Sequence, residues 1–164
     1  MKWHSAVTEC RSHQERLLKA KQYIDKNLPF EPDDLAELSD EDCAWLDQYL
    51  YRFSKLQDTM GERLFPAGLL ILGEDFTHRP FIDILNRLEA LEMIPGRQWW
   101  QLQREYRNQI AHEYPERRIE QCAAINGICG ECDEVLRVLD FVIDAIEFKR
   151  NENMTSSNEK ENGL

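Results

Sequence analysis

The stretch from Ser39 to Met60, SDEDCAWLDQYLYRFSKLQDTM, decides the fold class, because its apolar residues recur three or four positions apart. That spacing places them on one face of an α-helix that packs against a core. The residues on this face are Trp45, Leu46, Tyr49, Leu50, Phe53, Leu56 and Met60. Ser39 and Asp42 resemble a capping box with Asp in place of the usual Glu, so we expect the helix to begin there. Pro66 should kink or interrupt it, because proline lacks a backbone N–H.

The other segments also show helical periodicity, and none shows the alternation of a strand. Further helices are expected over residues 2–26, 77–93, 98–113 and 116–149. Thr77 is a candidate cap, and residues 27–34, with two prolines, are expected to form a loop. The predicted fold class is all-α, an up-and-down bundle of about five helices.

Length and composition indicate one domain outside the membrane. The 164 residues are enough for a single domain, which we assign to residues 1–149, whereas the polar residues 150–164 are expected to be a disordered tail. No apolar run could cross a bilayer and the N-terminus lacks a signal-peptide pattern, so we expect a cytoplasmic location and no membrane contact. Five cysteines, an odd number, fit that compartment.

The net charge of −11 is unusual for a protein that binds nucleic acid. The densest run of positive charge consists of Arg97, Arg104, Arg107, Arg117 and Arg118. This local excess could guide RNA to the chain. Equally, these arginines could form ion pairs with the neighbouring glutamates 105, 113, 116 and 120.

The most informative motif is RNQIAHEY, residues 107–114, at the end of the helix expected over residues 98–113. Arg107 and His112 are five residues apart, about 140° around a helix axis, so they converge only through the length of Arg and the helix end, or through a second copy of the chain. His can take and give a proton near neutral pH, and Arg can hold a phosphate with two N–H groups. This chemistry suits phosphodiester cleavage without a metal. By itself the pair is also compatible with a surface Arg and a His at a helix C-terminus that have no function.

The longer string RNxxAHxY, placed before a long final helix, resembles the HEPN superfamily and looks closest to the HepT-like ribonuclease toxins. Residues 51–61, YRFSKLQDTMG, resemble the second helix of this group more weakly. The resemblance implies a helical homodimer with the motif at its interface, which cleaves RNA and has a minimal nucleotidyltransferase antitoxin as partner.

Carried over to this sequence, the resemblance makes Arg107 and His112 the catalytic pair and Asn108 the polar residue beside the Arg. His112 would act as general acid and base, Arg107 as phosphate clamp and Asn108 as an orienting group. Tyr114 would be the tyrosine that the nucleotidyltransferase modifies with AMP, and the added negative charge would silence the toxin. Neither a metal nor a cofactor is expected to take part.

Three further arginine and lysine residues, Arg104, Arg52 and Lys55, are candidate RNA phosphate contacts. Two other functions stay open. In one, the same cluster belongs to a non-catalytic HEPN module that binds a nucleotide or RNA, or docks the nucleotidyltransferase. In the other, the chain is a structural helical protein whose acidic surface meets a basic partner.

A tryptophan pair and a group of three cysteines are interpreted as residues that pack in the structure. Trp99 and Trp100 open the helix that carries the motif, and we expect them in the core or at a dimer contact. Cys122, Cys129 and Cys132 include a CxxC pair, but they lack the fourth ligand of a zinc site and the βαβ context of a redox site. We expect them to be small packing residues.

Overall fold

The computed structural model describes residues 2–110 and 118–161, with the backbone alone described for residues 153–161. Its elements are α1 (Lys2–Ile24), η1 (Asp25–Asn27), α2 (Pro32–Ala36), α3 (Asp40–Thr59), η2 (Met60–Leu64), α4 (Phe65–Ile71), α5 (Phe81–Ala90), α6 (Arg97–Ile110) and α7 (Arg118–Glu161). Short η1 is a 3₁₀ turn and η2 is a π-helical turn. The described residues contain no strand, so the all-α prediction is confirmed for them.

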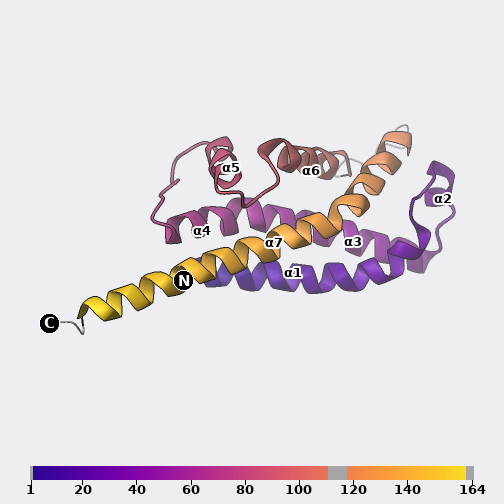
Figure 1. Cartoon of the computed structure of the whole chain (residues 1–164). Coiled ribbons are helices and arrows are strands. Elements are labelled where there is room, and N and C mark those ends of the chain that lie inside the picture. Colours follow the sequence, from indigo (N-terminus) through magenta and orange to yellow (C-terminus); the bar gives the residue numbers. More distant parts are fainter. Residues whose placement is uncertain (1, 111–117, 162–164) are drawn as a thin grey trace.

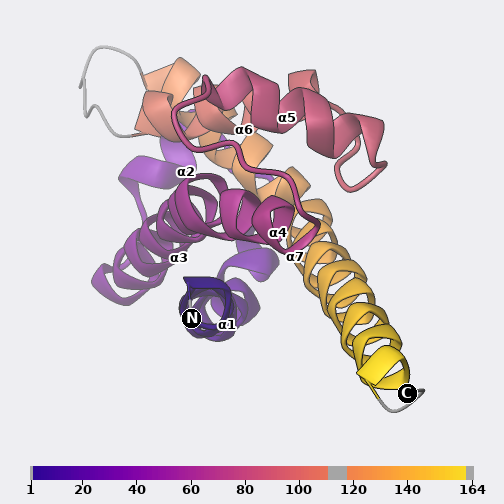
Figure 2. The same cartoon turned by 90° about the vertical axis from the view of Figure 1, so that its left-hand side faces the viewer.

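The long helices run side by side, and α5 and α6 cover one side of them. In Figure 1, α1, the continuous run from α3 to α4, and α7 follow the long axis of the molecule. Seen from the end in Figure 2, α1 and the α5–α6 pair lie on opposite sides of α3–α4, while α7 lies along the flank. The α3–α4 run therefore stands at the centre and contacts both layers.

The apolar face predicted for residues 39–60 faces the core. Tyr49, Phe53 and Leu56 are fully buried, whereas Trp45 and Leu50 are half-buried at the edge of the cluster. Ser39 caps the helix as expected, because its hydroxyl oxygen accepts a hydrogen bond of 3.1 Å from the Asp42 backbone N–H.

Pro66 does not end this helix, because the backbone changes geometry just before it. Over η2 the hydrogen bonds span five residues instead of four, and the Phe65 N–H bonds to the Met60 carbonyl. The widened turn brings Pro66 into the first turn of α4, where a missing N–H and a fixed φ are tolerated.

Other predicted boundaries were wrong for local reasons. Thr77 is not a cap: its N–H bonds to the Asp75 side chain at 2.7 Å, and α5 begins only after Pro80, which disfavours helical geometry in the residue before it. The expected loop over residues 27–34 contains the start of α2, where Glu31 and Asp34 form a capping box.

The last helix also differs from its prediction, because α7 continues past residue 149 to Glu161. Residues 150–161 contain neither Pro nor Gly, and ion pairs from Lys149 to Glu152 and from Arg150 to Glu147 support the helix at the predicted boundary. The C-terminal part of α7 extends beyond the other helices in Figure 1. No helix of the described residues is long and apolar enough to cross a membrane.

Candidate functional site

The helix that carries Arg107 is fixed on two sides. Trp100 is 1% exposed and packs edge-on against Phe65 of α4, with ring centroids 4.9 Å apart. Trp99 donates a hydrogen bond of 2.8 Å to Glu131 of α7, which also accepts one from the buried Gln103. The expected packing role of both tryptophans is confirmed, and it locks α6 between α4 and α7.

A glycine on α7 lets the two helices approach closely. A Cβ at Gly127 would lie only 2.6 Å from Cζ of Tyr106, so the tyrosine ring occupies the space that a side chain would need. Tyr106 precedes Arg107 in the chain. Its seating on α7 therefore helps to set the position of the arginine.

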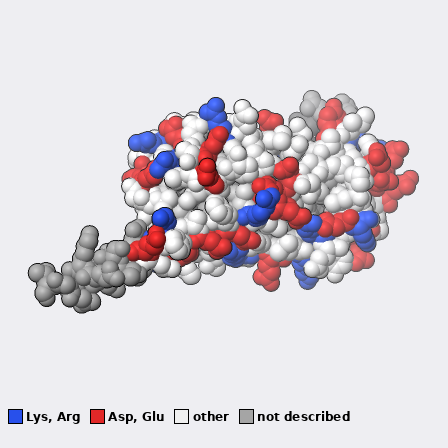
Figure 3. Space-filling model, in the orientation of Figure 1, with Lys and Arg blue, Asp and Glu red and all other residues white. Residues whose placement is uncertain are grey.

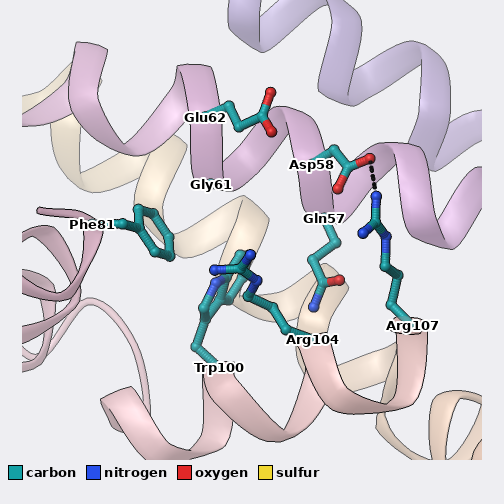
Figure 4. Close-up of a pocket in the computed structure, with 8 residues that line it drawn as sticks. All are labelled: Gln57, Asp58, Gly61, Glu62, Phe81, Trp100, Arg104 and Arg107. Carbon is teal, nitrogen blue, oxygen red and sulfur yellow. Dashed lines mark hydrogen bonds and ion pairs between the residues drawn. The ribbon is translucent and has the colours of Figure 1, made fainter. Parts of the chain in front are cut away.

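The guanidinium of Arg107 reaches across to α3. Its Nη2 donates to Oδ2 of Asp58 at 2.9 Å, and both side chains are about one third exposed, at 34% and 29%. Its Nη1 donates to Oδ1 of Asn108 at 3.3 Å. Figure 4 shows Arg107 rising from α6 toward Asp58. Sequence reasoning missed Asp58, although it lies within the 51–61 segment, because nothing in the sequence joins it to a residue 49 positions away.

Beside this ion pair lies a pocket of about 240 Å³ between the α3–η2 run and α6 (Figure 4). Besides Asp58 and Arg107 it is lined by Gln57, Gly61, Glu62, Phe81, Trp100 and Arg104. The guanidinium of Arg104 lies 5.6 Å from the ring centroid of Phe81, and Arg104 makes no ion pair among the described residues. Two of the predicted arginines, 104 and 107, are thus brought to one pocket.

The other predicted phosphate contacts lie on another side of α3. Arg52 is 3.3 Å from Nδ1 of His13 on α1, while Lys55 and Arg52 both approach the exposed ring of Tyr51. Burial and the charges of Arg52, Lys55 and Arg16 hold the pKa of His13 below its ordinary value. Tyr51 and Arg107 line a second hollow. The Tyr51 ring therefore lies between Arg107 and the positively charged side chains of Arg52 and Lys55.

Two predicted site residues of the motif, His112 and Tyr114, lie outside the described residues. The described part of the site is therefore the arginine half of the motif, with Asn108 beside it and Asp58 holding it.

The three cysteines near the start of α7 are buried. Cys122 donates to the Phe30 carbonyl at 3.1 Å, and burial raises the pKa of Cys129 to about 12 and that of Cys132 to about 11. Thiols with such pKa values are poor nucleophiles near neutral pH. Among the described residues no group of three or more His, Cys, Asp or Glu is arranged to hold a metal.

Among the described residues, no ion pair joins the arginines near the motif to Glu105 or Glu120, and Arg117, Glu113 and Glu116 lie outside the described part of the chain. Arg107 pairs with Asp58, and Arg97 bonds through its side chain to Asn86 and through its backbone to Glu89. On the face drawn in Figure 3, acidic and basic side chains are intermingled.

Comparisons with protein-family models, with curated proteins and with solved structures found no match to this chain. The resemblance of RNQIAHEY to HEPN ribonucleases therefore stays a prediction from the motif.

Proposed function

We propose that this protein is a metal-independent RNA endonuclease of the HEPN type, acting as the toxin of a toxin–antitoxin pair. The observation that carries the proposal is Arg107. Asp58 holds its guanidinium at the edge of a pocket that also contains Arg104, and the motif histidine follows five positions later. An arginine fixed by a carboxylate at an open pocket is suited to receive a phosphate.

The spare hydrogen-bonding capacity of Arg107 supports this role. A guanidinium has five N–H donors. Asp58 takes one and Asn108 takes one, and no described residue accepts from Nε. The remaining donors suffice for a two-point contact with a phosphodiester, while Asp58 keeps the side chain in one orientation.

The proposed reaction uses the RNA itself as nucleophile. His112 would remove the proton from a ribose 2′-OH, whose oxygen attacks the adjacent phosphorus. The bond to the 5′-oxygen of the next nucleotide breaks, and that oxygen takes a proton from an imidazolium. Arg107 would stabilise the negative charge on the pentavalent phosphorus. The products are a 2′,3′-cyclic phosphate and a 5′-OH, so atoms and charge balance without water.

Two further parts of the proposal concern partners. A homodimer with the motif at its interface would supply two copies of His112, one as base and one as acid. A minimal nucleotidyltransferase would serve as antitoxin by attaching AMP to Tyr114. The attached nucleotides would block the RNA path and add negative charge beside the histidine.

The first test is cleavage of labelled RNA in EDTA by the full chain, beside His112→Ala and a matched variant, His4→Ala, on the exposed side of α1. The parent and His4→Ala should cleave with cyclic-phosphate ends, and His112→Ala should be at least about a hundredfold slower, as expected for loss of a general acid–base group. Far-UV circular dichroism checks that all three are helical, and intact mass reports any AMP.

Two results would count against the proposal. Cleavage that survives in His112→Ala would remove the histidine from the mechanism. No cleavage of several RNAs by an unmodified, folded dimer would favour the non-catalytic binding module.

A further inference from the structure

The pocket beside Arg107 contains two buried hydrogen-bond donors without partners. Gln57 is 3% exposed and Trp100 is 1% exposed, and neither Nε2 of Gln57 nor Nε1 of Trp100 finds an acceptor among the described residues. Figure 4 shows Gln57 descending from α3 between Arg104 and Arg107. Buried donors almost always have a hydrogen-bond acceptor. Two such donors without an acceptor in the wall of one pocket indicate that a bound molecule supplies the acceptors.

A glycine in the pocket wall lets two aromatic rings lie close to the backbone. Gly61 lies within the helical run at η2, where glycine is less favourable than alanine. A Cβ there would lie 3.4 Å from Cζ of Phe81 and 3.5 Å from Cζ2 of Trp100, so any longer side chain would enter the pocket. Single π-helical turns occur frequently at functional sites.

The chemistry of the lining suits a flat, aromatic ligand with acceptors on its edge. Phe81 offers a partly exposed ring surface, whereas the Trp100 ring and the unpaired N–H groups of Gln57 and Trp100 form the buried wall behind it. Ring nitrogens or carbonyl oxygens of a ligand meet these donors where the ligand displaces the side chains that cover them. The carboxylate of Glu62, which has no partner among the described residues, can accept from ring N–H or amino groups. The volume of about 240 Å³ leaves room for a ligand much larger than one water molecule.

We infer that this pocket receives one unpaired nucleobase of the RNA strand, next to the phosphate that Arg107 holds. The inference rests on the proposed ribonuclease function and specifies its substrate: a single-stranded segment whose base leaves the stack and enters between α3 and α6. Base stacking on aromatic side chains and edge contacts are how proteins recognise unpaired RNA. The site would then select the base beside the cut.

Indole N–H resonances give a direct test with the full chain. The Nε1–H groups of Trp3 and Trp99 already donate to Glu147 and Glu131, whereas that of Trp100 is unpaired. Titration with AMP, GMP, CMP and UMP should shift the Trp100 resonance, assigned through Trp100→Phe, for at least one nucleotide. Ribose 5-phosphate, which lacks a base, should not shift it. An equal response to ribose 5-phosphate, or no response to any nucleotide, overturns the inference.

Substitutions that fill the pocket provide a second test of the inference. Gly61→Leu should weaken binding of the responding nucleotide on the order of tenfold or more, because it removes the stacking space. The matched variant is Gly130→Leu on α7, where a Cβ would meet nothing within 4 Å, and it should bind as the parent does. Gln57→Leu keeps the glycine and removes one donor, so it tests the same pocket if Gly61→Leu does not fold. Unchanged affinity in the folded pocket variants would refute the inference.

Binding and cleavage fail separately in this design. His112→Ala removes the proposed catalysis but leaves the pocket, so it should still bind the nucleotide. If the parent binds a nucleotide but does not cleave RNA, the ribonuclease proposal is refuted and the nucleobase pocket is supported. If Gly61→Leu cleaves RNA at the parent's rate and with its sequence preference, the ribonuclease proposal is supported and the nucleobase pocket is refuted. If Gly61→Leu instead changes the oligomer mass without affecting nucleotides, the pocket is an interface between copies and the inference is wrong.

Discussion

Replacing Gly127 with alanine should destabilise the protein, although alanine is normally the better helix residue. The new Cβ would lie 2.6 Å from Cζ of Tyr106 and 2.8 Å from both Cε atoms, whereas carbon atoms in contact prefer about 3.5–4.0 Å. The ring must therefore retreat by roughly 1 Å from α7. Overpacking of this kind costs about 1–3 kcal/mol, and the helix preference of alanine over glycine returns about 0.5–1 kcal/mol.

The expected net loss is about 1 kcal/mol, within a range of about 0–2.5 kcal/mol, measured by equilibrium urea unfolding followed by circular dichroism. Gly130→Ala is the control, because its Cβ meets nothing and it should stabilise the protein by up to about 1 kcal/mol. In a Tyr106→Ala background the clash disappears, so Gly127→Ala should there become stabilising. The reasoning is refuted if Gly127→Ala is as stable as Gly130→Ala, or if removal of Tyr106 leaves its sign unchanged.

Three more predictions concern the site and its surroundings. Asp58→Asn should lower the rate of RNA cleavage on the order of tenfold, because Asp58 orients the Arg107 guanidinium. The free energy of unfolding should change by less than about 1 kcal/mol, because the ion pair is partly exposed. A large loss of stability with full activity would contradict this. In native protein at pH 8, a thiol reagent should modify the exposed Cys43 rapidly and the four buried thiols slowly, since burial raises the pKa of Cys129 to about 12; a second fast thiol would be inconsistent with this. The pKa of His13, measured by NMR titration, should lie below 6.5 and rise in Arg52→Gln, which removes a nearby positive charge. Because the pKa of His13 is lower in the folded protein, the stability that this histidine contributes is present above pH 6.5 and is lost as the pH falls through the folded pKa. A His13 pKa that does not change in Arg52→Gln would argue against the charge effect.

Much of the helical architecture was predictable because it follows from local patterns. The apolar face of residues 39–60 and the Ser39 cap each depend on residues a few positions apart, and both were found where expected. The misplaced start of α5 also has a local cause, the restriction that Pro80 imposes on its neighbour. The π-helical turn was not predictable, because its geometry depends on how α3 and α4 pack on α1 and α7.

The candidate site was predictable only on the α6 side. Arg107, Asn108 and Arg104 came from one short motif and its preceding turn. Asp58 and Gln57 join them only because α3 packs against α6, a long-range contact that periodicity does not reveal. One signal was available in hindsight: a glycine inside a strongly periodic helical stretch, Gly61, which usually has a packing or functional reason.

The π-helical turn at Met60–Leu64 gives this helix one residue more than an α-helix would hold between the same contacts. Removing one residue there, Gly61 for example, would let the hydrogen bonds return to the four-residue span of an α-helix, so helical content would be kept. The residues on either side of the deletion would also keep nearly the same orientation relative to each other, because the wide turn already accommodates the extra residue. Asp58 could then still face α6 while Phe65 faces Trp100. Homologous chains that share this site should therefore tolerate the loss of one residue in this turn far better than the insertion of one, which would rotate the two flanks by about 100° relative to each other.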